Sequence, residues 1–464
     1  MKRLLLLGCL SPLLFGQSLE GIWQGTLAAG ASRLRVVFHI SKSADGKFTG
    51  SIDSPNQGAK GIPVSAVTRN GQSVRIESAA IGATYEGVLA VDGKTLTGKW
   101  QQRGTGLPLA LERVEKAPEI RRPQEPSRPY PYDEEEVSYE NKKGGTKFSG
   151  TLTLPRAKGR VPAVILLSGS GAQDRNETAF GHRPFLVLAD YLTRRGVAVL
   201  RVDDRGVGGS TGDLLQSTII DLAGDARAGV DFLKGHKAID AAKIGLVGHS
   251  EGALVASCLA SESKDLSFIV LLAGSAVVGE QLLYKQSELI VKVMGVTPEI
   301  AAISRNAQQS LFRVIKEEKD PALAQKKLSG IAQNVLEQTP EAQRELTRKA
   351  MQVQFQALQS RWFRFFVTYD PAPALKKVTC PVLALFGEKD FQVPPDQNLP
   401  AAEAALKAGG NKDYTVKNLP QLNHLFQTAK TGSPTEYPAI EETIAPGALE
   451  TIADWIGRHV KPAR

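Results

Sequence analysis

The chain has 464 residues, more than one ordinary hydrophobic core accommodates, so two or three domains are expected. Its composition, 42% hydrophobic and 23% charged, is that of a globular protein and excludes a low-complexity chain. The net charge of +9 falls to +7 once the two charges of Lys2 and Arg3 are removed with a leader, and no basic run is interleaved with aromatic residues, which argues against nucleic-acid binding.

The N-terminus is typical of a secretory signal peptide. A basic start precedes the apolar run Leu4–Phe15, which is interrupted by Pro12 and followed by small and polar residues. This run is too short to span a bilayer as a helix, so no membrane span is expected. We therefore expect residues 1–18 to be cleaved and the protein to be exported to the periplasm or secreted. A lipid anchor at Cys9 is a minor alternative, since the residues around it resemble a lipoprotein cleavage site.

The segment 19–114 is predicted to form a small antiparallel β-barrel or sandwich. Its β-prone runs are separated by Asp45-Gly46, Asn70-Gly71 and Asp92-Gly93, pairs that tolerate positive φ and suit tight hairpins. The opening Gly21-Ile22-Trp23 is similar to the start of lipocalin-like barrels. Such a barrel could hold a ligand or a cell-envelope partner, which the sequence does not identify. The expected strands are Leu34–Ile40, Phe48–Ile52, Val74–Glu77, Tyr85–Val91 and Thr95–Trp100.

A proline-rich segment, 115–133, is predicted to be an extended linker, because proline at this density joins neither a helix interior nor a sheet. From residue 134 to 464, apolar strand-like runs alternate with helical stretches, which predicts an α/β domain with a doubly wound, mostly parallel sheet. About ninety residues, 276–367, have a helical pattern without strand signals and are expected to form a helical cap over the ligand-binding edge. The expected strands are Phe148–Leu154, Val161–Leu167, Val197–Val202, Ile244–Val247, Phe268–Leu272, Val382–Phe386 and Tyr414–Val416.

The strongest motif is Gly248-His249-Ser250-Glu251-Gly252. It follows an apolar strand and opens a helix of small residues, which is the context that a Gly-x-Ser-x-Gly nucleophile elbow requires. The glycines relieve crowding around a serine held in a strained conformation, and the helix N-terminus favours negative charge nearby. Ser250 is therefore the predicted nucleophile.

A serine nucleophile needs a base and a carboxylate that orients it. Among six histidines, His424 follows the last predicted strand, at the edge where loops after parallel strands gather, and is the expected base. Asp390, in the acidic loop after Val382–Phe386, is the expected acid, with Glu388 as the runner-up. The order serine, acid, base suits this fold. The other histidines are set aside because they lie in the β-domain, in the elbow itself, at the opposite edge, in an early loop or in the final helix: His39, His249, His236, His182 and His459.

The oxyanion of a tetrahedral intermediate needs two backbone N–H groups. Glu251 supplies one, and Ser170, in the loop Ser168-Gly169-Ser170-Gly171, is the expected second donor. A dinucleotide-binding Gly-x-Gly-x-x-Gly pattern is absent there, because residue 174 is Asp174.

Residues from about 135 to the end resemble the α/β-hydrolase superfamily, and most of all bacterial exported serine esterases. Two motifs carry this resemblance, Gly169-Ser170-Gly171-Ala172-Gln173-Asp174-Arg175-Asn176-Glu177 and Asp203-Asp204-Arg205-Gly206-Val207-Gly208-Gly209-Ser210. Many relatives have His-Gly where this chain has Ser168-Gly169. For Asp174, Arg175, Asp204 and Arg205, ion pairs that brace the loops are favoured over substrate contacts.

The leading hypothesis is hydrolysis of small, short- to medium-chain acyl esters through an acyl-enzyme. Serine aminopeptidase and acyl-thioesterase activities remain alternatives, because the leaving-group preference is set by the shape of the cap. No cofactor is expected, and no metal, because the histidines lack ligand spacing. Cys258 and Cys380 permit one disulfide, but two buried thiols are preferred.

Overall fold

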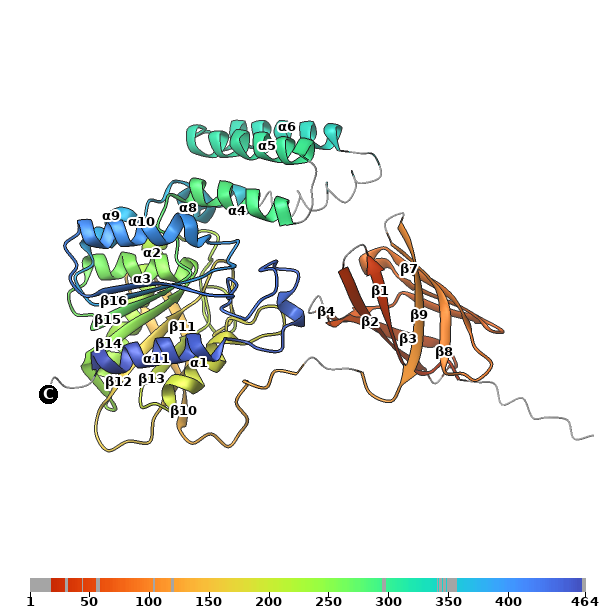
Figure 1. Cartoon of the computed structure of the whole chain (residues 1–464), viewed down its shortest axis with the longest axis horizontal. Coiled ribbons are helices and arrows are strands. Elements are labelled where there is room, and N and C mark those ends of the chain that lie inside the picture. The colour runs from red at the N-terminus through yellow and green to blue at the C-terminus, as the bar shows by residue number, and fades with distance from the viewer. Residues whose placement is uncertain are drawn as a thin grey trace, which may run out of the picture. The chain divides into compact units, whose positions relative to one another are not determined.

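A computed structural model describes residues 18–460, apart from 30–31, 44, 56–58, 103–104, 118–120, 294–297 and, between 340 and 356, all but Glu341, Arg344 and Arg348. Residues 1–17, which hold most of the predicted signal peptide and Cys9, lie outside the described part. The chain divides into two compact units, Met1–Ile120 and Arg121–Arg464. Figure 1 labels their elements.

The first unit is one nine-stranded antiparallel sheet of order β4-β3-β2-β1-β9-β8-β7-β6-β5. The three predicted turn glycines, Gly46, Gly71 and Gly93, have φ of 84°, 60° and 67°, which explains why these turns need glycine. Trp23, Phe38 and Tyr85 are fully buried and pack at the centre of its core. The strands are β1 Gly21–Ala29, β2 Ser32–Lys42, β3 Phe48–Ser54, β4 Ala59–Pro63, β5 Ala66–Asn70, β6 Ser73–Ser78, β7 Ala83–Leu89, β8 Thr95–Gln102 and β9 Thr105–Val114.

The second unit contains an eight-stranded mixed sheet of order β10-β11-β13-β12-β14-β15-β16-β17. Six neighbouring strands, β13, β12, β14, β15, β16 and β17 in sheet order, are parallel. The other two, β10 and β11, are antiparallel and lie at one edge. The predicted fold class, an antiparallel β-domain followed by an α/β domain with a mostly parallel sheet, is confirmed. The strands are β10 Asp133–Asn141, β11 Thr146–Leu154, β12 Val161–Leu167, β13 Ala198–Val202, β14 Ile239–His249, β15 Phe268–Leu272, β16 Val382–Gly387 and β17 Tyr414–Leu419.

Helices cover both faces of this sheet (Figure 1). On one face, α1 (Pro184–Thr193) and α11 (Pro446–Val460) bury apolar side chains such as Leu188 and Ile456 against the strands. On the other face, α2 (Ile219–Gly235), α3 (Glu251–Glu262) and α10 (Pro395–Ala408) enclose a second apolar cluster. The central strands β14, β15 and β16 are therefore buried on both sides, as their continuous apolar runs require.

The described residues between β15 and β16 are mostly helical. They form α4 (Gly279–Val293), α5 (Pro298–Glu317), α6 (Pro321–Gln338), α8 (Arg361–Thr368) and α9 (Ala372–Lys377). The helices α4, α5, α6 and α8 share a small apolar cluster of their own, centred on Phe312, Leu328 and Val367. The helices α4, α5, α6 and α8 are here termed the cap. They correspond to the predicted insertion 276–367, whereas α9 follows it.

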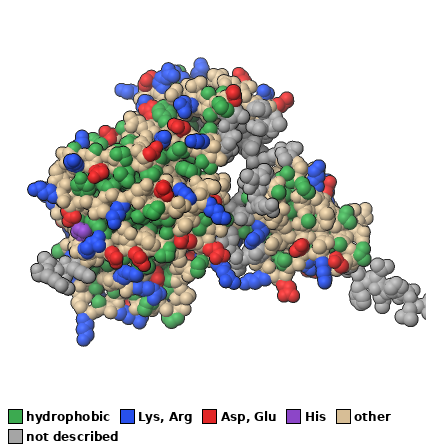
Figure 2. Space-filling model, viewed as in Figure 1, with side chains coloured by type: hydrophobic (Ala, Val, Ile, Leu, Met, Phe, Trp, Pro, Cys, Tyr) green, Lys and Arg blue, Asp and Glu red, His purple; other side chains and the backbone are tan. Residues whose placement is uncertain are grey.

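Three other features bear on the predictions. Cys258 and Cys380 are free thiols, the first buried and the second half-buried. On the face seen in Figure 2, Lys and Arg side chains are interspersed with Asp and Glu. Within the described ranges, no helix has the length and apolarity needed to cross a membrane.

The predicted linker, 115–133, is divided by the boundary between the two units. Its second half is hydrogen-bonded to the α/β unit. Arg122 donates to the carbonyl oxygens of Gly181 (3.0 Å), Pro438 (2.8 Å) and Ile440 (2.6 Å). Gln124 donates to the carbonyl oxygen of Ile444 at 2.6 Å and accepts the N–H of Thr443 at 2.6 Å. Residues 121–132 are thus a strap fastened to this unit.

We expect a fragment 121–464 to unfold at a higher temperature than a fragment 131–464. Removal of Arg122 and Gln124 leaves part-buried carbonyl and N–H groups without their partners, at a cost of about 1–3 kcal/mol for each buried group. Every 1 kcal/mol lowers the Tm of a unit of this size by roughly 2–4 °C. Thermal denaturation followed by circular dichroism measures the difference, and equal Tm values would contradict a stabilising strap.

Candidate active site

Ser250 occupies the turn that joins β14 to α3. Its backbone has φ 53° and ψ −114°, a strained conformation for a residue with a side chain. The N–H of Ser250 donates to the carbonyl oxygen of Leu272 on β15 at 2.8 Å, which fixes the turn to the sheet. A Cβ on Gly248 would lie 2.1 Å from the carbonyl oxygen of Gly252, and a Cβ on Gly252 would lie 2.1 Å from that of Leu167. The two glycines of the motif are therefore required by close backbone approach.

Asp390 and His424 lie in the loops that follow β16 and β17. The Nδ1 of His424 is 2.8 Å from Oδ2 of Asp390, and both side chains are almost completely buried. The other carboxylate oxygen of Asp390, Oδ1, accepts the N–H groups of Gln392 (2.7 Å) and Val393 (2.9 Å). The carboxylate is thus held on both sides, and it orients the imidazole with its proton on Nδ1 and its Nε2 free to act as a base.

Ser250 and His424 line one cavity of about 350 Å³. Asp390 stands behind His424, on the side of the imidazole that carries Nδ1. The other sequence-predicted site residues, Ser170 and Glu251, line the same cavity. The structure therefore brings all five predicted residues to one place, whereas Glu388, the runner-up acid, is exposed and accepts the N–H of Gln421 instead.

The loop after β12 has one backbone N–H already engaged. The N–H of Gly169 donates to Oε1 of Glu177 at 2.7 Å. By contrast, the N–H groups of Ser170 and Glu251 donate to no other group in the described part of the chain. These two N–H groups remain free for an oxygen atom placed near Ser250, which is the chemistry of an oxyanion hole.

The side chain of Glu251 links the cap to the loop 168–171, which is here termed the oxyanion loop. Its carboxyl accepts a hydrogen bond from the indole N–H of Trp362, on α8, at 2.5 Å. It also accepts one from the hydroxyl of Ser170. Burial raises the pKa of Glu251 to about 7, because its partners are neutral and compensate only in part for lost hydration. Sequence reasoning assigned a role only to the backbone of Glu251. No sequence signal pairs residue 251 with residue 362.

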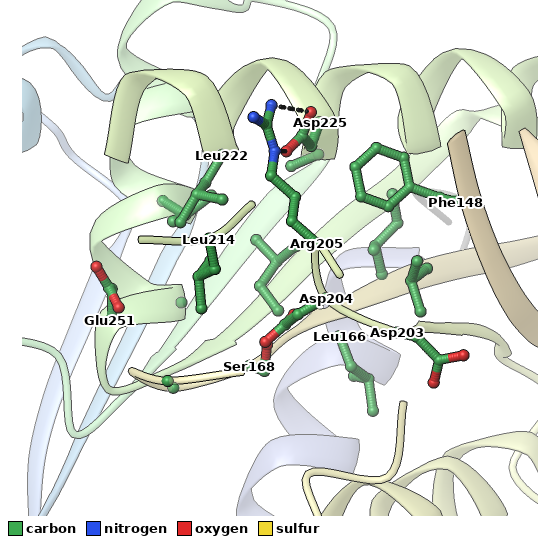
Figure 3. A pocket seen from close by; sticks show the side chains of 18 of the residues that line it. Phe148, Leu166, Ser168, Asp203, Asp204, Arg205, Leu214, Leu222, Asp225 and Glu251 are labelled. Carbon is green, nitrogen blue, oxygen red and sulfur yellow. Dashed lines mark hydrogen bonds and ion pairs between the residues drawn. The ribbon is translucent and has the colours of Figure 1, made fainter. Parts of the chain in front are cut away.

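A second, smaller cavity of about 70 Å³ lies behind the oxyanion loop (Figure 3). At its edge the Ser168 hydroxyl donates to Oδ1 of Asp204 at 2.6 Å. Burial raises the pKa of Asp204 to about 7. Ser168, which replaces a histidine of the resembling esterases, therefore tethers this loop to the one after β13.

As predicted, Arg175 and Arg205 form ion pairs that brace loops, whereas Asp174 and Asp204 brace loops through hydrogen bonds. Arg175 pairs with Asp203 at 2.8 Å, and Arg205 pairs with Asp225 at 2.6 Å, as the dashed lines in Figure 3 show for the second pair. Asp174 accepts the N–H groups of Asn176 and Thr178, both at 3.0 Å. None of Asp174, Arg175, Asp204 and Arg205 lines the cavity that holds Ser250.

Two residues to which sequence reasoning gave no role, His249 and Glu177, also line this cavity. His249 was set aside as the neighbour of Ser250, and Glu177 was noted only as part of a motif. In the structure His249 is buried between Glu177 and the backbone of His424. Its position next to the nucleophile excludes it as the base, as predicted, but does not exclude a positioning role.

One wall of the cavity is aromatic. Trp362, Phe363 and Phe366 of α8 line it, together with Leu282 and Leu283 of α4. The fourth aromatic of this segment, Phe365, instead stacks on Tyr369, with ring centroids 5.4 Å apart. The aromatic side chains of α8 thus have two roles: Phe365 packs against Tyr369, and the other three rings line the cavity.

Several known proteins are similar to this chain. The family model described as serine aminopeptidase, S33, a hydrolase family, matches residues 183–428. Among curated proteins, the chain is 26% identical over 316 residues to esterase EstD of Thermotoga maritima, an alignment that covers 66% of this chain and 65% of EstD. It is 33% identical over 126 residues to an uncharacterised protein of Mycobacterium tuberculosis, covering 27% of this chain and 41% of that one. The chain thus spans about two thirds or less of these curated relatives.

Solved structures that are similar to this chain include an esterase and the protein Est1E. The Pyrococcus furiosus esterase PF2001 is 17% identical, with a TM-score of 0.43, covering 71% of this chain and 92% of that chain. Est1E from Butyrivibrio proteoclasticus, solved with ferulic acid, is 18% identical, with a TM-score of 0.39, covering 69% of this chain and 96% of that chain.

Proposed function

Since the chain belongs to the α/β-hydrolase family described as serine aminopeptidase, S33, we propose that it is a serine hydrolase that cleaves carboxylic esters. The observation that carries this proposal is a serine on a strained elbow, sharing one cavity with a histidine whose far nitrogen contacts a buried carboxylate. The name of the relative EstD supports an ester over an amide bond as the substrate.

The proposed reaction uses Ser250, His424 and Asp390 as a triad. The Ser250 hydroxyl attacks the ester carbonyl while Nε2 of His424 takes its proton. The resulting oxyanion accepts the N–H groups of Ser170 and Glu251, and Asp390 stabilises the imidazolium. His424 then protonates the leaving alcohol, leaving an acyl group on Ser250. A water molecule, deprotonated by His424, attacks this acyl-enzyme and releases the carboxylic acid.

The cavity favours a neutral acyl group. Its described lining contains aromatic and aliphatic side chains, glutamines and carboxyl groups, but neither Lys nor Arg. An anionic acyl chain would face the carboxyl group of Glu251 with no Lys or Arg in the described lining, and the two histidines there are already engaged, His249 by Glu177 and His424 by Asp390. Substrates with an uncharged acyl group are therefore proposed over those with a carboxylate on the acyl chain.

The second candidate is aminopeptidase activity, which the description of the matching family favours. Acyl-thioester hydrolysis is a further possibility on the same triad. Purified protein assayed with matched p-nitrophenyl ester, acyl-thioester and aminoacyl-anilide substrates separates these activities. We expect the highest kcat/KM on the ester. A higher kcat/KM on the anilide would contradict the esterase proposal and favour an aminopeptidase.

The aromatic wall and limited volume of the cavity, about 350 Å³, predict a preference for short acyl chains. We expect kcat/KM for p-nitrophenyl esters to rise with acyl length from about two carbons and to fall beyond about eight, because each buried methylene contributes about 0.8 kcal/mol only while the cavity has room. A series of esters of increasing length gives the measurement. Activity that still rises at sixteen carbons would indicate an open groove and contradict the short pocket.

We also propose that the protein is exported, to the periplasm or outside the cell, because residues 1–18 have the pattern of a signal peptide. N-terminal sequencing of the mature protein would identify the cleavage site. A mature chain that begins with a lipid-modified Cys9 would favour the anchored alternative.

A further inference from the structure

His249 is a buried histidine whose two ring nitrogens both face hydrogen-bond acceptors. Nδ1 lies 2.8 Å from Oε1 of Glu177, and Nε2 lies 3.0 Å from the carbonyl oxygen of His424. A carbonyl oxygen cannot donate, so Nε2 must carry a proton. Whether Nδ1 also carries a proton depends on whether the carboxyl of Glu177 is ionised or protonated.

Glu177 is buried and accepts from two directions at the same oxygen. Its Oε1 takes the N–H of Gly169 at 2.7 Å as well as the contact from His249. The N–H of Gly169 donates to Oε1, and a hydrogen bond of this kind favours the charged carboxylate over a protonated carboxyl at this oxygen. His249 therefore donates from both nitrogens and is an imidazolium, paired with the Glu177 carboxylate.

These contacts form one continuous chain of hydrogen bonds next to the elbow. It runs from Gly169, beside the oxyanion donor Ser170, through Glu177 and His249 to the backbone of His424. The two loops that it joins follow β12 and β17, which are not neighbours in the sheet. His249 itself is the last residue of β14 and immediately precedes Ser250. The connection thus touches all three parts of the proposed machinery.

We propose that His249 and Glu177 are positioning residues: their ion pair fixes the oxyanion loop and the His424 loop relative to Ser250, and ester hydrolysis requires the doubly protonated form of His249. This inference rests on the proposed function, since it assigns to the pair the alignment of that triad. A misplacement of about 1 Å in such a constellation costs on the order of 100-fold in rate.

The electrostatic setting agrees with this assignment. Burial opposes protonation of His249, but the charge and hydrogen bond of Glu177, the carbonyl of His424 and the more distant charge of Asp390 raise its pKa above the usual 6.5. The titratable groups that face the imidazole are Glu177, Asp390 and His424, whose ring centroid is 4.8 Å away. A raised pKa means that the pair is intact below this pKa and is lost as the pH rises through it.

The kinetic test compares His249→Gln and Glu177→Gln with the unaltered full chain. A glutamine at 249 cannot bridge both acceptors, so we expect kcat on a short p-nitrophenyl ester to fall about 10- to 100-fold while KM changes less than about threefold. If the protonated form of His249 is required, kcat of the unaltered protein declines as the pH rises through the pKa of His249. This alkaline decline should vanish in His249→Gln. In Glu177→Gln it should move to lower pH, because the counter-charge is gone. A merely structural role would lower Tm and leave these pH profiles unchanged.

His182→Gln is the matched control. His182 is equally buried in the same unit and contacts Thr443 and the carbonyl of Tyr437, but burial lowers its pKa to about 4. This variant removes a buried imidazole of comparable size, and it should retain the alkaline decline of kcat.

A spectroscopic measurement on the unaltered protein keeps the proposal testable if a variant does not fold. In protein labelled with carbon-13 at the histidine ε-carbon, one buried histidine should still be mostly imidazolium at pH 6.5, where an unperturbed imidazole is about half protonated, and this signal should be absent from His249→Gln or shifted in Glu177→Gln. Neutral imidazole signals for all buried histidines at this pH would overturn the proposal. So would a His249→Gln variant with kcat within twofold of the original and an unchanged alkaline limb.

Failure of the proposed function gives a different result. If Ser250 is not the nucleophile, a fluorophosphonate probe labels the protein at another residue, whereas the imidazolium signal of His249 persists. If only the positioning role fails, the probe labels Ser250 at an unchanged rate in His249→Gln.

Discussion

Replacement of Ser250 by alanine is expected to lower kcat for ester hydrolysis by about 10⁴- to 10⁶-fold, because the acyl-enzyme can no longer form. Alanine keeps the Cβ and hence the strain of the φ 53° backbone, so Tm should stay within roughly 1 °C. Steady-state kinetics, thermal denaturation and labelling by a fluorophosphonate probe provide the three readouts. Labelling should disappear together with activity.

Ser250→Gly is a useful companion to this variant. It removes the same hydroxyl but also the Cβ, and glycine adopts positive φ without steric cost. It should therefore be as inactive as Ser250→Ala yet more stable, by about 1–3 kcal/mol if the full strain is relieved. Persistent labelling of another serine in either variant would show that Ser250 is not the nucleophile.

Asp390→Asn is expected to lower kcat by about 10⁴-fold, for a reason that the hydrogen bonds of Asp390 make specific. Oδ1 accepts two backbone N–H groups, from Gln392 and Val393, so the oxygen of an asparagine would take this place. Its NH₂ group would then face Nδ1 of His424, where Oδ2 now lies. The imidazole would have to move its proton to Nε2, and this tautomer cannot accept the proton of Ser250.

Glu388→Gln is the matched control for the acid. Glu388 lies two residues earlier in the same loop, is exposed, and accepts the N–H of Gln421 at 2.8 Å. Its substitution should change kcat less than about tenfold, since surface charges contribute little. If Glu388→Gln lost activity and Asp390→Asn kept it, the acid would be Glu388. Kinetics and Tm of the two purified variants decide between them.

Much of the fold could be predicted because the central strands are continuous apolar runs, each between clear turn signals. Strand β10 could not. Its sequence is acidic, its residues are largely exposed, and it lies at the sheet edge directly after the proline-rich segment, so no apolar pattern marks it. The strap was also missed, since Arg122 and Gln124 bind backbone groups more than 300 residues away in the chain. Composition indicates an extended segment but not what it contacts.

The candidate site divides in the same way. Four of the five predicted residues line one cavity and Asp390 stands directly behind His424, because each follows a parallel strand or the elbow, and the ends of such strands meet at one edge. The pairs Glu177–His249 and Glu251–Trp362 could not be inferred. Each joins residues from separate loops or from the cap, and side-chain contacts of this kind depend on how the layers pack. A histidine inside the elbow gave no signal of its partner.

The place of the cap in the chain has a consequence for how the molecule folds. Strands β15 and β16 pair side by side, with Ile269 opposite Val382, although the whole cap separates them along the chain. Closing a loop of this length costs about 2 kcal/mol more than closing one of ten residues. The half of the sheet that carries Asp390 and His424 is therefore expected to dock late, after β12, β14 and β15 have assembled. Because each doubling of loop length costs only about 0.6 kcal/mol, the cap can be lengthened or replaced at little thermodynamic cost, which makes it the part of the molecule where new substrate preferences arise most readily.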